Sequence, residues 1–145
     1  MKELANMILT RANETNTPVT NLHLQKVMYF LLVFMADTPK YNEQARELFN
    51  QGNLQAWPYG PVDPGVYQDY KKFKDRPIKL ECDFSPITSI DETLTTWIDK
   101  LLKINVFSLV RLSHEHRFWA NNEDNIKKGF RPEYTFDDIV GAMND

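Results

Sequence analysis

A chain of 145 residues is close to the usual size of one domain, and its 42% of apolar residues is typical of a folded globular protein. The formal net charge of −3 disfavours a dedicated DNA-binding protein, whose affinity comes largely from neutralising phosphates. Cys82 is the only cysteine, which excludes a disulfide framework and a multi-cysteine zinc site and leads us to expect a cytoplasmic protein.

The first half of the chain predicts helices. Residues 2–13 carry apolar side chains at helical spacing, and Pro18 separates them from a second, strongly apolar segment. This segment, residues 21–36, predicts a central helix capped by Thr20 or Asn21. Its apolar run is half as long as the roughly 20 residues that a membrane-spanning helix needs, so we expect a buried helix and no membrane partner.

A helix is also predicted over residues 41–50, with Gly52 as its C-terminal cap. Residues 54–57 predict a short extended segment. The stretch 58–65 contains three prolines and two glycines, which indicates a shaped loop. Asp63 then has the features of an N-cap, with Pro64 in the first position of a helix that we expect to reach about residue 74.

In the second half, residues 77–86 alternate weakly and predict an extended stretch or an edge strand. Asp91 can cap a helix that follows it, and residues 107–113 predict a shorter helix. Thr135 and Asp138 resemble a capping box that opens a last helix. We expect its apolar positions to be Phe136, Ile139, Val140 and Met143.

These elements together predict a mainly α fold. We expect a single compact helical domain over residues 1–145, built around the buried helix 21–36, with at most a small β-hairpin.

Motifs for catalysis or metal binding are lacking. The glycines do not form a phosphate-binding loop, and there is no nucleophile elbow. His114 and His116 are two residues apart, so their side chains would diverge on a helix, and His114 is expected to pack at a helix end instead. We therefore expect no enzyme, no catalytic residue, no metal site and no cofactor.

Basic residues cluster at 71–76 and at 127–128. Both clusters fit solvated helix ends, where lysines interact favourably with the helix dipole. Nucleic-acid binding at 71–76 is the alternative, but Tyr70 and Phe73 lie at core spacing rather than on an exposed stacking face. A nucleic-acid-associated regulator is therefore the second hypothesis for function.

The segment 57–62 admits two interpretations. Trp57 and Tyr59 beside prolines would give a rigid aromatic surface suited to protein contact. Alternatively, both aromatic rings fill the core while Gly60 and Pro61 set the turn into the next helix. The residue types alone favour the second interpretation.

Three motifs in order resemble the Panacea antitoxin family. They are Leu-Gln-Lys-Val-Met-Tyr-Phe at 24–30, Ala-Trp-Pro-Tyr-Gly-Pro-Val at 56–62 and Val-Tyr-Gln-Asp-Tyr-Lys at 66–71. Residues 112–119 resemble a later family segment, although Phe118 replaces its usual proline before the second tryptophan.

The resemblance implies an antitoxin, often prophage-borne, that neutralises a protein toxin encoded nearby by direct binding. In the SocA-like branch the antitoxin delivers its toxin to a ClpXP-type protease. The resemblance does not imply an enzyme. The candidate partner-binding residues are Trp57, Tyr59, Gly60, Pro61, Val62, Tyr67 and Trp119.

Overall fold

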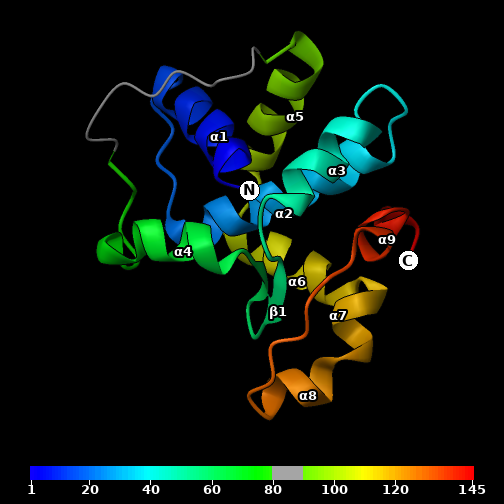
Figure 1. Cartoon of the computed structure of the whole chain (residues 1–145). Coiled ribbons are helices and arrows are strands. Elements are labelled where there is room, and N and C mark those ends of the chain that lie inside the picture. The colour runs from blue at the N-terminus through cyan, green and yellow to red at the C-terminus, as the bar shows by residue number, and fades with distance from the viewer. Residues whose placement is uncertain (80–89) are drawn as a thin grey trace.

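The computed structural model describes residues 1–79 and 90–145 (Figure 1). Helices dominate it, and the predicted mainly α fold is confirmed. Its helices are α1 (Lys2–Glu14), α2 (Asn21–Ala36), α3 (Asn42–Asn50), α4 (Pro64–Tyr70), α5 (Glu92–Lys103), α6 (Val106–Glu115), α7 (Arg117–Asn121), α8 (Glu123–Lys127) and α9 (Phe136–Ile139). Short 3₁₀ turns η1 (Lys71–Phe73) and η2 (Ala142–Asn144) follow α4 and α9, and strands β1 (Gln55–Trp57) and β2 (Gly60–Val62) form a hairpin.

Helix α2 forms the centre of the core, as its apolar sequence predicted. Nearly all of its side chains are buried, and it packs against α1, α3, α4, α5, α6, α9 and β2. Its N-cap is Thr20, whose hydroxyl accepts a hydrogen bond from the backbone N–H of His23 at 3.2 Å. The helix therefore sets the position of every element around it. No helix in the described ranges is long and apolar enough to cross a membrane.

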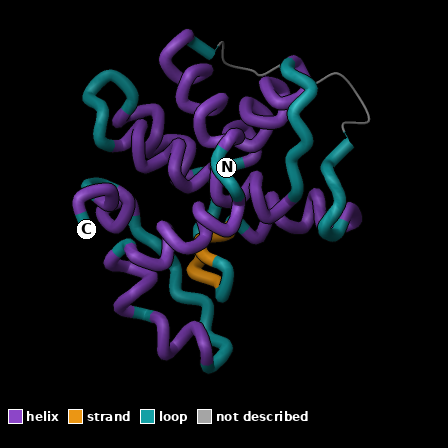
Figure 2. The backbone as a smooth tube through the Cα atoms, turned by 180° about the vertical axis from the view of Figure 1, so that it is seen from behind, coloured by secondary structure: helices purple, strands orange, loops and turns teal. Residues whose placement is uncertain are grey.

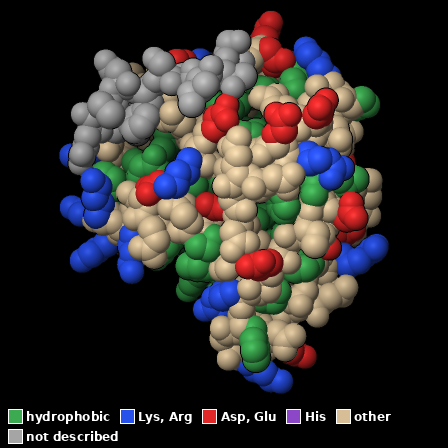
Figure 3. Space-filling view, viewed as in Figure 1, with side chains coloured by type: hydrophobic (Ala, Val, Ile, Leu, Met, Phe, Trp, Pro, Cys, Tyr) green, Lys and Arg blue, Asp and Glu red, His purple; other side chains and the backbone are tan. Residues whose placement is uncertain are grey.

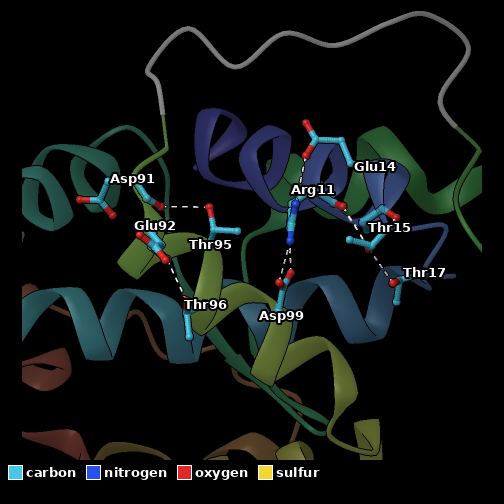
Figure 4. Close-up of polar contacts among 10 residues, drawn as sticks. Arg11, Glu14, Thr15, Thr17, Asp91, Glu92, Thr95, Thr96 and Asp99 are labelled. Atoms are coloured by element: carbon cyan, nitrogen blue, oxygen red, sulfur yellow. Dashed lines mark hydrogen bonds and ion pairs between the residues drawn. The ribbon is translucent and has the colours of Figure 1, made fainter.

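An ion pair joins α1 to α5 (Figure 4). The Arg11 guanidinium donates to both carboxylate oxygens of Asp99, at 2.9 and 2.8 Å, and these hydrogen bonds hold the pKa of Asp99 below its usual value. Asp91 caps α5 by accepting from the backbone N–H of Leu94, which confirms the predicted start of this helix.

Part of the predicted loop after Trp57 is a strand. In the hairpin, Trp57 pairs with Gly60 across a two-residue turn (orange in Figure 2). The positive φ of Gly60, 101°, suits glycine and lets the chain reverse in so few residues. The free edge of β1 is covered by the segment before α9, because Ala56 N–H donates to the Pro132 carbonyl and Tyr134 N–H donates to the Leu54 carbonyl.

The start of α4 agrees with its prediction, and its end does not. The Asp63 carboxylate accepts from the backbone N–H of Val66 at 3.0 Å, but the α-helix ends at Tyr70 and continues only as η1. Gly52 is not the predicted C-cap of α3, since Gln51 takes that place and Gly52 has no positive φ. A Cβ at Gly52 would lie 2.5 Å from the Asp63 carboxylate, so close packing requires the glycine.

The last helix is shorter than predicted. Its capping box between Thr135 and Asp138 is confirmed, and Phe136 and Ile139 are buried. Val140 and Met143 were predicted as apolar positions of this helix, and that prediction was wrong. Helix α9 ends at Ile139, and both residues lie beyond it with exposed side chains.

Helices α7 and α8 were not predicted from the sequence.

The predicted extended stretch 77–86 is described only in part. Residues 77–79 form no strand, and the Ile78 N–H donates to the Val19 carbonyl at 2.8 Å. The remainder of that stretch lies outside the described residues.

Candidate functional site

A surface cavity of about 670 Å³ lies beside the hairpin, and we call it the aromatic groove. Its lining comes from the start of α2, the hairpin, α4 with the residues after it, and the start of α6. Four of the predicted partner-binding residues line it together with Phe107: they are Trp57, Tyr59, Val62 and Tyr67. The fold thus places Tyr67 of α4 and Phe107 of α6 around one cavity with the aromatic residues of the hairpin.

The hairpin presents its aromatic residues in different ways. Tyr59 stands in the two-residue turn with 63% of its surface exposed, so the alternative that placed it in the core is wrong. Trp57 is half-buried; its ring centroid lies 5.1 Å from that of Tyr67, and its indole N–H donates to Gln55 Oε1. Tyr59 is therefore free to contact another molecule, whereas Trp57 is held against α4.

Gly60 and Pro61 lie beneath the groove rather than in its lining. The Lys26 ammonium group donates to the Pro61 carbonyl at 2.5 Å, and a Cβ at Gly60 would lie 2.5 Å from the Ser113 hydroxyl. Lys26 is fully buried, and loss of hydration lowers its pKa to about 7. These two residues fix the hairpin onto α2 and α6.

Trp119 does not line the groove either. It is buried in α7, its indole N–H donates to the Trp57 carbonyl at 2.9 Å, and its ring stacks on His114 with centroids 3.7 Å apart. Trp119 thus supports the hairpin from the side of α7.

The two nearby histidines have separate partners. His116 Nδ1 lies 2.7 Å from the Tyr29 hydroxyl, whereas His114 stacks on Trp119, as expected of a packed residue. Burial lowers the pKa of both imidazoles. Within residues 1–79 and 90–145 there is no group of three or more His, Cys, Asp or Glu side chains that could hold a metal ion.

The basic cluster after α4 borders the groove. Lys and Arg side chains gather along the left edge of the molecule, around the end of α4 (Figure 3). Lys71 and Lys74 belong to the lining, both are exposed, and neither forms an ion pair in the part of the chain that the structure describes. Phe73, by contrast, is half-buried with Lys72 near its ring.

Phe107 is the large aromatic residue of the lining that the sequence analysis did not select. It is 63% exposed at the start of α6, whose buried residues are Leu109, Val110 and Ser113. Position 107 lies off that buried face, and a large aromatic residue outside the apolar face of a helix is a signal that was available in the sequence.

Comparison with known proteins gives one informative match. The chain is 38% identical over 68 residues to the antitoxin SocA of Caulobacter vibrioides (strain NA1000 / CB15N). The predicted resemblance to SocA-like antitoxins is confirmed. The match covers 46% of this chain and 32% of SocA, so it spans about a third of that relative's length. No family profile matches the chain, and no solved structure matches it significantly.

Proposed function

We propose that this protein is an antitoxin that neutralises a protein toxin encoded nearby by binding it directly through the aromatic groove. The similarity to SocA supports an antitoxin role. The observation that carries the mode of action is the exposure of Tyr59, 63%, at the edge of an apolar groove. Such a role is stoichiometric, needs no catalytic group in this chain and acts in the cytoplasm, where the toxin is made.

Co-expression with the product of the neighbouring open reading frame tests this proposal. The neighbour alone should arrest growth, and this chain should restore growth and co-purify with the neighbour's product. If the neighbour is harmless alone, the antitoxin proposal is wrong. If growth is restored while the toxin disappears, and the toxin persists when the ClpXP-type protease is deleted, the antitoxin acts by delivering the toxin to a protease and not by direct neutralisation.

Tyr59→Ala tests the site within the same experiment. Since Tyr59 is exposed, the variant should melt as the wild type does but lose most of the complex and the growth rescue. Phe130→Ala is the matched control, because Phe130 is 62% exposed and does not line the groove. Equal rescue by the two variants would exclude Tyr59 from the binding surface.

A further inference from the structure

We propose that the aromatic groove docks an amphipathic helical segment of a protein partner that carries acidic residues beside its apolar side chains. That this partner is the toxin rests on the proposed function above. On this surface Phe107 would contact apolar side chains of the partner, and Lys71 and Lys74 would pair with its carboxylates.

The apolar part of the recognition comes from two separate elements. Tyr59 on the hairpin and Phe107 on α6 each leave 63% of their surface exposed while lining one cavity. Large apolar side chains that gather at one exposed hollow mark an interaction site. The volume of about 670 Å³ lies within the range of cavities that enclose a ligand's apolar groups.

The charge of the lining points to an acidic partner. Lys71 and Lys74 contribute two positive charges and Asp75 one negative charge, so the described lining residues carry a net charge of +1 on a chain of net charge −3. Because neither lysine has an ion-pair partner within the described ranges, both can meet carboxylates without breaking an existing pair.

The hairpin also restricts how the partner can bind. A peptide cannot extend the sheet at β1, whose outer edge already pairs with Pro132 and Tyr134. At β2, the Pro61 carbonyl accepts from Lys26 and the Asp63 N–H donates to Gln25 Oε1. With strand addition closed at both edges, recognition is through side chains, which is the way an amphipathic helix binds in a groove.

Peptide selection on the full chain tests the chemistry without a known toxin. A phage library of random 16-residue peptides is selected on the wild type, with parallel selection on Phe107→Ala. The wild type should enrich peptides that combine apolar residues at helical spacing with Asp or Glu, and Phe107→Ala should not. The Kd of a selected peptide, measured by fluorescence anisotropy, should rise about thirtyfold in Tyr59→Ala and in Phe107→Ala, as expected for hot-spot residues.

A double variant tests the charges. Lys71→Glu with Lys74→Glu should raise the Kd about tenfold and flatten its dependence on salt, because rim charges act mainly through long-range attraction. Lys100→Glu with Lys128→Glu is the matched control, since both lysines are exposed outside the groove and the change in net charge is the same. Phe130→Ala is the control for the aromatic variants. Unchanged thermal melting of each variant shows that the fold is intact.

Several results would overturn the inference. They are equal enrichment on wild type and Phe107→Ala, enrichment of basic peptides, or equal effects of the groove variants and their controls. Displacement of the selected peptide by oligo-dT would also overturn it, since that would assign the aromatic groove to single-stranded nucleic acid.

The experiments distinguish failure of this inference from failure of the proposed antitoxin function. If the chain rescues growth and the groove variants rescue equally, this inference fails and the antitoxin role stands. If it selects acidic apolar peptides at the groove but does not rescue growth, the inference stands and the antitoxin role fails.

Discussion

Lys26 lies beneath the hairpin, fully buried, with its ammonium nitrogen 2.5 Å from the Pro61 carbonyl oxygen. Removal from water disfavours its charged form, and its pKa falls from 10.5 to about 7. The pKa of the nearby His114 is lowered mainly by burial and, to a smaller extent, by the positive charge of Lys26.

We predict that Lys26 makes stability rise with pH between about 7 and 10.5. Below that window both native and unfolded chains hold the proton, and the native chain bears the full desolvation penalty. Within it the unfolded chain binds one more proton than the native chain, so the free energy of unfolding increases by at most about 1.4 kcal/mol per pH unit. Urea unfolding at several pH values should show this slope in the wild type relative to Lys26→Met, in which other groups titrate as before. If the unfolding free energies of the wild type and of Lys26→Met change in parallel with pH, the lowered pKa of Lys26 is contradicted.

Gly60→Ala should destabilise the protein and loosen the hairpin. Its φ of 101° is unfavourable for alanine, and the added Cβ would lie 2.5 Å from the Ser113 hydroxyl and 3.0 Å from Lys26 Cε. We expect a loss of about 1–3 kcal/mol from backbone strain, with the steric clash in addition. Gly129→Ala separates the two effects, since Gly129 has a φ of 100° and open space around its Cβ position. Equal losses of unfolding free energy in the two variants would show that the contacts with Ser113 and Lys26 do not matter.

At the scale of elements, the sequence was informative where the signal is local. Thr20, Asp63 and Asp91 were predicted as caps because a side-chain oxygen satisfies an N–H only two or three residues away. The groove was not predicted, since it needs the hairpin and α6 to meet through tertiary packing. Only its individual aromatic residues were visible, and Phe107 was overlooked.

Helix α7 is joined to the hairpin by a hydrogen bond from Trp119, and Trp119→Phe tests whether this bond matters for the groove. The variant keeps a ring to stack on His114 but loses the indole N–H that donates to the Trp57 carbonyl at 2.9 Å. We expect a loss of about 1 kcal/mol in unfolding free energy and weaker partner binding, although Trp119 does not line the groove. Trp97→Phe on α5 is the control, because Trp97 packs against Phe34 and Tyr41 far from this bond. Binding that falls equally in both variants would indicate a general loss of stability.

At the scale of the whole molecule, most of the fold class followed from the single apolar segment that became α2. A helix with apolar side chains on all sides has to be surrounded, and α1, α3, α5 and α6 supply that cover. The number and order of the surrounding helices were only partly predictable. Helices α7 and α8 have five residues each, which is too short for a helical pattern of apolar residues to be recognised, and each has one buried residue, Trp119 and Ile126.

We propose that residues 1–145 fold as one unit, and Leu31→Ala tests it. Leu31 is fully buried in α2, so its truncation leaves a cavity and should lower the free energy of unfolding by about 2–5 kcal/mol. Because all neighbouring elements share this core, tryptophan fluorescence and far-ultraviolet circular dichroism should report one coincident transition in the wild type, shifted as a whole in the variant. Leu112→Ala, at an exposed position of α6, should leave it nearly unchanged. If the two probes give separate transitions, residues 1–145 do not unfold as one unit, and the proposal is wrong.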